Sequence, residues 1–174
     1  MTKEELGKLL KEAALLKGEF TLRSGRKSNY YFDKYLFETK PEVLRPLTKE
    51  LAKLLPPLDS FDRLGGPELG AVALATALSL EVNKPFIIVR KEEKAYGTSK
   101  MMEGEVFKGD KVVLVEDIMT TAGAAIASAD KLKHSGIEVV MIIGVLDREE
   151  GARENIEAAG YMYKALFKKS ELGI

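Results

Sequence analysis

The feature that most constrains the fold is an alternation of apolar runs and helix-like segments in the second two-thirds of the chain. The runs PFIIV, DKVVLVED and IEVVMIIGVLD are separated by longer segments such as PELGAVALATALSLEVN and TTAGAAIASADKLKHSG. Apolar, β-branched strands joined by helices are typical of a parallel sheet that is covered on both faces. We therefore predict an α/β fold with a central parallel sheet flanked by helices and a last strand near Tyr161 to Phe167.

The first forty residues follow a different pattern. Leucine and alanine residues between positions 6 and 16 recur at helical spacing, which predicts an amphipathic helix of roughly four turns that ends near Gly18. Two β-prone pieces, residues 20–22 and 30–32, then flank a Ser-Gly turn, which favours a hairpin. A second helix is expected from Pro41 to the proline pair at 56–57, because proline suits the first turn of a helix and does not continue it.

Composition excludes several classes of function. The 174 residues carry 27 Lys plus Arg and 27 Asp plus Glu, so no net charge directs the chain to nucleic acid or to an anionic membrane. The absence of cysteine excludes disulfides, thiol nucleophiles and Cys-based zinc sites, and it suits a reducing cytosol. No apolar run approaches the roughly 18 residues of a membrane span. We expect one soluble, cytoplasmic domain over residues 1–174, with neither a nucleic-acid nor a membrane partner.

The stretch VVLVEDIMTTAG carries the clearest chemical signal. Glu116 and Asp117 stand where an apolar strand emerges, and the small or hydroxyl residues 120–124 open the next helix. A helix start offers free N–H groups and a positive dipole end, which suit a phosphate. Acids beside an anion site are repulsive unless they face hydroxyls or a metal, so a sugar phosphate satisfies both parts. An ordinary strand-to-helix turn with an Asp cap is the alternative.

Two other nucleotide-binding loops are absent from the sequence. It contains neither the G-x-x-x-x-G-K-[ST] loop of P-loop NTPases nor a G-x-G-x-x-G after the first strand. The acidic stretch instead resembles the phosphoribosyl pyrophosphate (PRPP) motif of the type I phosphoribosyltransferases. This resemblance implies the fold of that superfamily, with an N-terminal hood at about residues 1–40 and a core at about residues 41–174. It also implies that the turn GGPELG, residues 65–70, binds pyrophosphate through backbone amides.

The same resemblance assigns roles within the motif. Glu116 and Asp117 would contact the ribose hydroxyls, and the residues that follow would wrap the 5′-phosphate. The PRPP-binding residues implied in this stretch are Glu116, Asp117, Ile118, Met119, Thr120, Thr121, Ala122, Gly123 and Ala124. Two of them depart from the usual T-T-G-G-[ST] ending, because Ala122 replaces a glycine and Ala124 replaces a hydroxyl residue. The second change removes one hydrogen bond to the phosphate, although backbone donors remain.

Three further segments resemble the orotate phosphoribosyltransferases within that superfamily. VRKEEKAYGTSKMMEG is similar to their catalytic loop, EFTLRSGRKSNYYFD to their amino-terminal hood, and VLDREEGARENI to their L-D-R segment. The likeness spans nearly the whole chain. It implies transfer of the ribose 5-phosphate group of PRPP to orotate, giving orotidine 5′-monophosphate and diphosphate in de novo pyrimidine biosynthesis.

The catalytic loop would supply cations to the departing pyrophosphate. By the resemblance, Arg90, Lys91, Lys94 and Tyr96 join the PRPP-binding set, and Lys94 acts in catalysis together with Glu116 and Asp117. Tyr96 stands where many family members have histidine, and its phenol still donates a hydrogen bond.

Orotate carries a carboxylate and two ring carbonyls, which suit a planar cation. The predicted orotate-binding residues are Arg148, Thr120, Arg23, Tyr31 and Phe32. The alternative for Arg148 is a surface arginine that pairs with Glu149 or Glu150.

The resemblance also sets the expected cofactor and partners. Mg²⁺ would be held mainly by PRPP and water, so no dedicated protein ligands are expected. The loop Arg90–Glu103 would reach the neighbouring subunit's site, which implies a homodimer. Two alternatives remain open: a phosphoribosyltransferase for another base, because the acidic motif indicates only PRPP, and a non-catalytic PRPP-sensing regulator. The second lacks support from the amino-terminal segment, which has no helix-turn-helix pattern.

Overall fold

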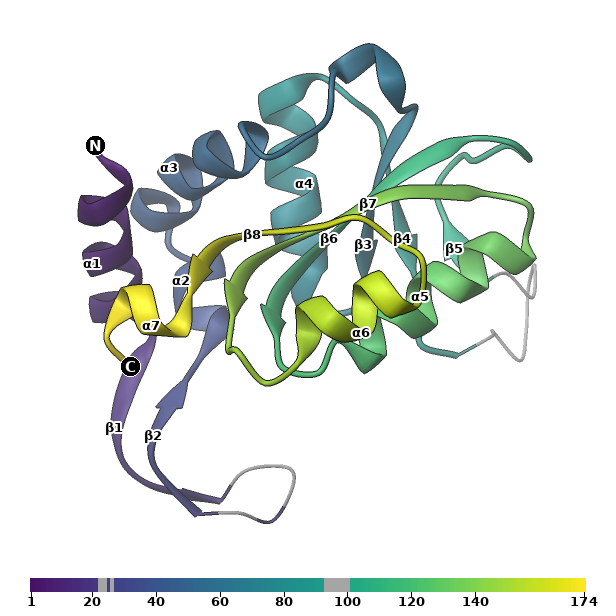
Figure 1. Ribbon diagram of the computed structural model, residues 1–174. Helices are drawn as coiled ribbons and strands as arrows, with labels where there is room; N and C mark the ends of the chain where they lie inside the picture. The colour runs from purple at the N-terminus through teal and green to yellow at the C-terminus, as the bar shows by residue number, and fades with distance from the viewer. Residues whose placement is uncertain (22–24, 26, 93–100) are drawn as a thin grey trace.

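A six-stranded sheet forms the centre of the molecule (Figure 1). The computed structural model describes residues 1–21, 25, 27–92 and 101–174. The strand order in the sheet is β5-β4-β3-β6-β7-β8. The strands are β3 (Arg63–Pro67), β4 (Phe86–Val89), β5 (Met102–Glu103), β6 (Lys111–Met119), β7 (Glu138–Asp147) and β8 (Tyr163–Lys168). All of them pair in parallel except β5, which runs antiparallel to the end of β4, so the predicted parallel sheet is confirmed with one added edge strand.

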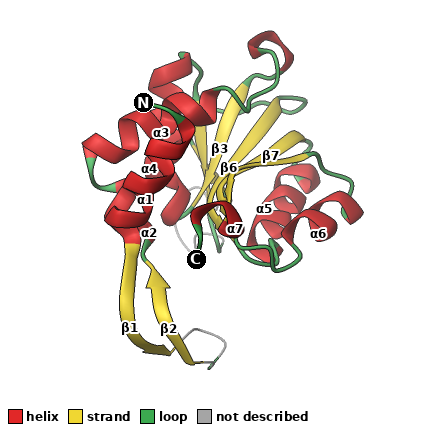
Figure 2. Cartoon of the chain, turned by 60° about the vertical axis from the view of Figure 1, so that its left-hand side comes forward, coloured by secondary structure: helices red, strands yellow, loops and turns green. Residues whose placement is uncertain are grey.

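Helices cover both faces of this sheet, as predicted (Figure 2). On one face lie α1 (Lys3–Ala14), α3 (Pro41–Ala52) and α4 (Gly70–Val82), and on the other lie α5 (Gly123–His134) and α6 (Ala152–Ala158). Strand β6 supplies both cores, because successive side chains of a strand point to opposite faces. Val113 and Val115 belong to the cluster with α1, α3 and α4, whereas Val112 and Leu114 belong to the cluster with α5 and α6.

Strand β6 extends further than its apolar run. Glu116 and Asp117 lie within the strand, because β6 continues to pair with β7 through Ile118 and Met119, opposite Leu146 and Asp147. The acidic pair is therefore fixed by the ladder of hydrogen bonds on either side of it. This pairing explains why the two carboxyl groups are held at the edge of the core and not in a free loop.

The amino-terminal segment differs in detail from its prediction. Helix α1 ends at Ala14, before Gly18, because the chain enters strand β1 (Leu15–Thr21), which pairs antiparallel with β2 (Lys27–Phe32). Figure 1 shows this hairpin projecting from one end of the molecule. A short helix that was not predicted, α2 (Lys34–Glu38), follows β2 and is capped by Asp33, whose side chain accepts a hydrogen bond from the Tyr35 N–H.

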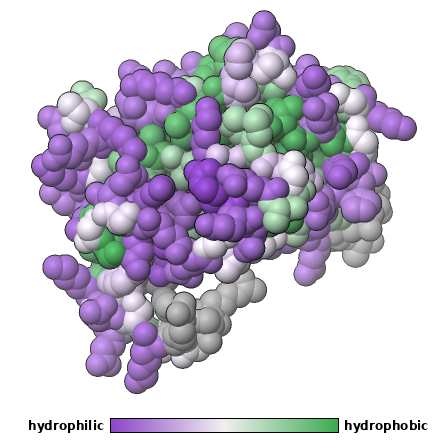
Figure 3. Space-filling view, viewed as in Figure 1, coloured by the Kyte–Doolittle hydropathy of each residue, from purple (hydrophilic) through white to green (hydrophobic). Residues whose placement is uncertain are grey.

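The remaining elements are short. They are the 3₁₀ helix η1 (Leu58–Ser60) and the C-terminal helix α7 (Lys169–Leu172). The surface in Figure 3 is predominantly hydrophilic, with small hydrophobic patches. In the part of the chain that the structure describes, no helix combines the length and the apolar character that crossing a membrane requires.

Candidate active site

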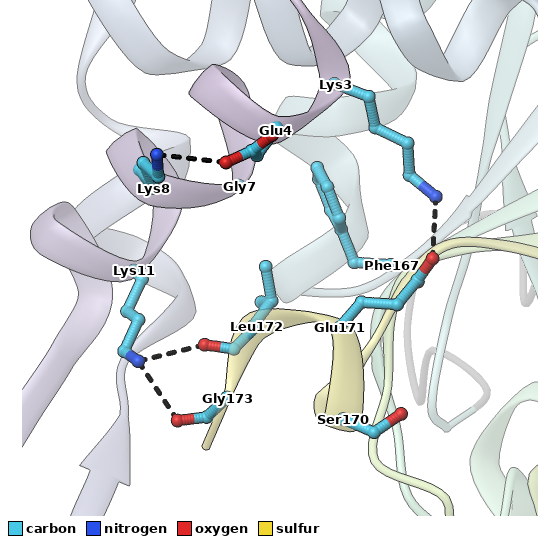
Figure 4. Close-up of a pocket in the computed structure, with 10 residues that line it drawn as sticks. All are labelled: Lys3, Glu4, Gly7, Lys8, Lys11, Phe167, Ser170, Glu171, Leu172 and Gly173. Carbon is cyan, nitrogen blue, oxygen red and sulfur yellow. Dashed lines mark hydrogen bonds and ion pairs between the residues drawn. The ribbon is translucent and has the colours of Figure 1, made fainter.

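Two cavities are candidates for the site, and the chemistry distinguishes them. The larger, of about 650 Å³, lies between α1 and α7 (Figure 4). Its charged groups satisfy one another: Lys3 pairs with Glu171 at 3.1 Å, and Lys11 donates to the carbonyl oxygens of Leu172 and Gly173 at 2.9 and 3.0 Å. These contacts fasten the end of the chain to α1, and none of the predicted site residues lies there.

The second cavity, of about 410 Å³, contains the predicted chemistry. It lies where the carboxyl ends of β3, β4 and β6 meet the starts of α2, α4 and α5, the edge at which parallel sheets bind ligands. Its charged lining residues come from five different elements or their connecting turns. They are the cations Lys34, Lys91 and Lys131 and the acids Glu68, Glu116 and Asp117.

Asp117 is the most strongly held group of the site. Its side chain is buried, and its Oδ2 lies 2.6 Å from the Nζ of Lys34 in α2. Although burial by itself lowers the pKa of Lys34, the Asp117 carboxylate raises that pKa above its ordinary value. Lys34 therefore stays charged and pairs with Asp117, whose carboxylate oxygens can accept hydrogen bonds from the hydroxyls of a sugar.

Glu116 is in a different state from its neighbour. Burial, with the Asp117 charge as the second cause, raises the pKa of Glu116 to about 8. At neutral pH most of its population is protonated, so it can both donate and accept a hydrogen bond. The expected repulsion between two acids and a nearby phosphate is thereby reduced, because the pair carries about one negative charge instead of two.

A third acid, Glu38 of α2, lies beside this pair and was not predicted. Its side chain is buried, and its Oε1 has no hydrogen-bond partner among the described residues. Burial, followed by the charge of Asp117, raises the pKa of Glu38 to about 8. The protonated form is the one that this environment favours.

The raised pKa of Glu38 predicts that the difference in stability between the parent and Glu38→Gln depends on pH. A carboxyl whose pKa is raised from 4.5 to about 8 in the folded chain costs no stability below about pH 4.5, where it is protonated in both states. Between these two pKa values only the unfolded chain ionises, so the fold is progressively destabilised, and the loss is complete above about pH 8. Glu38→Gln, which keeps the shape but cannot ionise, should be closest to the parent at pH 5. At pH 9 it should exceed the parent by about 1–3 kcal/mol in the free energy of unfolding.

Urea unfolding at pH 5, 7 and 9 measures this difference. The control is Glu42→Gln at an exposed position of α3, which should leave the pH profile of the parent unchanged. Parallel profiles for parent and Glu38→Gln would show that Glu38 ionises without cost in the folded protein.

The predicted phosphate cradle forms a helix start, as expected. Helix α5 begins at Gly123, and the exposed positions Thr121, Gly123 and Ala124 surround its first free N–H groups. Ala122 precedes the helix in the left-handed conformation, with φ 62° and ψ 15°. This backbone region costs an L-residue about 1–2 kcal/mol, which explains why the usual motif has glycine at this position. In this chain the Ala122 side chain is buried against α5, which offsets part of that cost.

The catalytic-loop residues are placed only at the start of the segment. Arg90 follows β4, donates its backbone N–H to the Met101 carbonyl at 2.9 Å, and pairs with Glu103 at 3.6 Å. Lys91 lines the cavity. Lys94 and Tyr96 lie outside the described residues, as does Arg23 of the hood.

The predicted orotate-binding residues are only partly brought together. Arg148 follows β7 and donates its backbone N–H to Met119, 2.8 Å away, beside Thr120. Its guanidinium contacts the hood through the Tyr30 hydroxyl at 3.4 Å and also pairs with Glu150 at 3.1 Å. The pairing with Glu150 is the contact that the alternative interpretation predicted, and binding of orotate by Arg148 stays a prediction.

Two hood residues differ from their prediction because of the alternation along β2. Phe32 does not reach the site: its side chain is 5% exposed and packs on Phe37 in the core, with ring centroids 6.2 Å apart. Tyr31 faces the other side, half-exposed, against Phe20. Tyr30, which was not predicted, shares the side of Phe32 and meets Arg148.

Comparison with known proteins finds similar sequences and structures. The phosphoribosyl transferase domain model matches residues 59–164. The chain is 48% identical to the orotate phosphoribosyltransferase of Pyrococcus horikoshii, over 99% of this chain and 93% of that protein.

Two solved structures of an orotate phosphoribosyltransferase from Mycobacterium tuberculosis H37Rv are also similar. One, a complex with Fe(III) dicitrate, has a TM-score of 0.86 and 32% identity, covering 99% of both chains. The other, a complex with PRPP, has a TM-score of 0.82 and 29% identity, again covering 99% of both chains. The similarity therefore includes the hairpin as well as the sheet.

Proposed function

The chain belongs to the orotate phosphoribosyltransferase family, and we propose that it uses the cavity at the carboxyl ends of β3, β4 and β6 to transfer the ribose 5-phosphate group of PRPP to orotate. The products are orotidine 5′-monophosphate and diphosphate. The observation that carries this proposal is the set of groups at the carboxyl ends of the strands: Glu116 with a raised pKa, Asp117 paired with Lys34, and the free start of α5. Cationic side chains line the same cavity.

The geometry suggests that different residues bind different parts of PRPP. The 5′-phosphate would lie on the first turn of α5, and the ribose hydroxyls would meet Glu116 and Asp117. Departure of pyrophosphate leaves an oxocarbenium-like centre, which the nearby Asp117 carboxylate stabilises, while cations such as Lys91 meet the charge of the leaving group. Lys94, Tyr96 and Arg90 remain predicted members of this set.

The base would enter between the core and the hood. Arg148 offers planar donors that match a carboxylate beside a ring carbonyl, and Tyr30 holds its guanidinium on the hood side. Thr120 lies next to Arg148 at the end of β6. This arrangement favours an anionic base, such as orotate, over a neutral one.

Mg²⁺ is the proposed cofactor, and it would neutralise the charge of the departing pyrophosphate. Within residues 1–21, 25, 27–92 and 101–174, no group of three or more His, Cys, Asp or Glu side chains is placed to hold a metal ion. Asp117 is already paired with Lys34, and the raised pKa of Glu116 keeps it largely protonated. PRPP and water are therefore the proposed ligands of Mg²⁺.

Removal of the metal tests this proposal. Orotate absorbance should fall when PRPP and Mg²⁺ are added, turnover should drop at least about tenfold in excess EDTA, and added Mg²⁺ should restore it. Full turnover in EDTA would contradict the metal assignment alone. Unchanged orotate absorbance with Mg²⁺ present would contradict the proposed reaction.

Three further parts of the proposal rest on the family. They are a role in de novo pyrimidine biosynthesis, a cytoplasmic location, and a homodimer in which the loop Arg90–Glu103 reaches the neighbouring subunit's site.

A further inference from the structure

The backbone of Arg90 and Lys91 is held from two sides by side chains of two other elements. The Lys91 N–H donates to Glu68 Oε1 at 2.6 Å. On the opposite side, Lys131 Nζ donates to the carbonyl oxygen of Lys91 and, at 3.1 Å, to that of Arg90. The Glu68 N–H in turn donates to the Val89 carbonyl at 2.9 Å, so Glu68 and the end of β4 are tied by two hydrogen bonds.

The two holding side chains come from the two proposed anion-binding elements. Glu68 lies in the turn after β3 that is proposed to bind pyrophosphate. Lys131 lies on α5, on the stripe formed with Ala124, Ala127 and Ser128 that faces the cavity, and the first turn of α5 is the proposed phosphate site. The backbone at Lys91 is thus attached to both elements that would grip PRPP.

These contacts also give both charged side chains a role other than direct contact with PRPP. An acid in a pyrophosphate-binding turn would repel its ligand, but the Glu68 carboxylate is directed at a backbone N–H. A lysine in the cavity could bind phosphate directly, but the Lys131 ammonium uses two donors on carbonyl oxygens. Hydrogen bonds to charged groups are the stronger kind, so each one restrains the Lys91 peptide appreciably.

We propose that Glu68 and Lys131 are positioning residues that fix the backbone of Arg90 and Lys91, so that these two cations face the pyrophosphate of PRPP. This inference rests on the proposed function. Neither residue needs to touch the substrate. Glu68 and Lys131 restrict the directions that the two cationic side chains can take before PRPP binds. This restriction lowers the conformational entropy that is lost on binding.

The test compares two ligands of which only one carries pyrophosphate. Lys131→Met keeps the length of the side chain but cannot donate, and it should weaken PRPP binding about tenfold while leaving the Kd of ribose 5-phosphate within about twofold. Lys131→Arg, which retains a cation, should recover most of the loss. The matched control is Lys133→Met, at an exposed position of the same helix, which should bind both ligands like the parent.

Amide hydrogen exchange of the ligand-free protein gives a readout that does not depend on activity. Exchange of the Lys91 N–H should be at least about tenfold faster in Lys131→Met and in Glu68→Ala than in the parent. Equal exchange rates, or equal weakening of PRPP and ribose 5-phosphate, would overturn the inference. A parent protein that binds neither ligand would instead overturn the proposed function, and the exchange rates would still decide whether the Lys91 peptide is restrained.

Discussion

Asp117→Asn is expected to lower kcat/KM for PRPP by about 100- to 1,000-fold, the largest effect of any single substitution in the site. Asparagine keeps the shape of the side chain but removes the charge that pairs with Lys34 and that would face the ribose at the transition state. Lys34 would then remain as an uncompensated cation beside the developing positive centre. Steady-state kinetics with PRPP as the varied substrate measures the loss.

Asp110→Asn is the matched control for this substitution. Asp110 lies just before the amino end of the same strand and pairs with Arg63 at the same distance, 2.6 Å, as Asp117 with Lys34. Breaking that pair should lower the free energy of unfolding by about 1–3 kcal/mol and leave kcat/KM almost unchanged. Equal kinetic losses in the two variants would show that Asp117 supports the fold and has no particular role with the ribose.

Gly70→Ala is expected to lower kcat/KM for PRPP by about 100-fold while the chain remains folded. A Cβ at Gly70 would lie 2.0 Å from Asp117 Oδ2 and 2.3 Å from Lys34 Nζ. Both are ends of side chains, so the ion pair would move before the backbone does. Helix α4 begins at Gly70, and alanine is a good helix former, so the damage should concentrate on the site. Steady-state kinetics measures the loss of activity, and thermal unfolding shows whether the fold is also destabilised.

A double variant shows whether the crowded pair causes the loss. Lys34→Ala removes one of the two charged groups that the new methyl group would meet, so Lys34→Ala/Gly70→Ala should lose less activity than the sum of the single losses. Strictly additive losses, or a Gly70→Ala variant with parental activity, would contradict the steric account.

The fold was predictable where burial determines the pattern. Strands β4, β6 and β7 carry apolar runs that stand out in the sequence, because helices cover both faces of the sheet there. The two-residue strand β5 and the helix α2 are too short to produce a periodic signal, and the hairpin pairing that shortens α1 depends on β1 and β2 meeting in space.

The site was predictable where its residues belong to a motif that is continuous in the sequence. Glu116, Asp117 and the start of α5 form one stretch, and the structure places them at the edge of one cavity. The Lys34–Asp117 contact joins residues 83 positions apart, so it follows from the fold and not from a motif. The raised pKa values of Glu38 and Glu116 likewise depend on burial, which the sequence does not specify.

The sequence also does not specify which of Tyr30 and Tyr31 faces Arg148. In the run NYYF, alternation places Tyr30 on the side of Phe32, but the sequence does not indicate which side meets the core. The core contact of Phe32 with Phe37 sets that choice, and it directs Tyr30 toward Arg148.

The identity of the accepted base tests the account most directly. The protein, with PRPP and Mg²⁺, is assayed by absorbance and pyrophosphate release against orotate, adenine, guanine, hypoxanthine and uracil in parallel. Consumption of orotate with matching release of pyrophosphate, and no turnover of the other four bases, is the predicted result. Turnover of a purine without turnover of orotate, or PRPP binding with no transfer to any base, would contradict it.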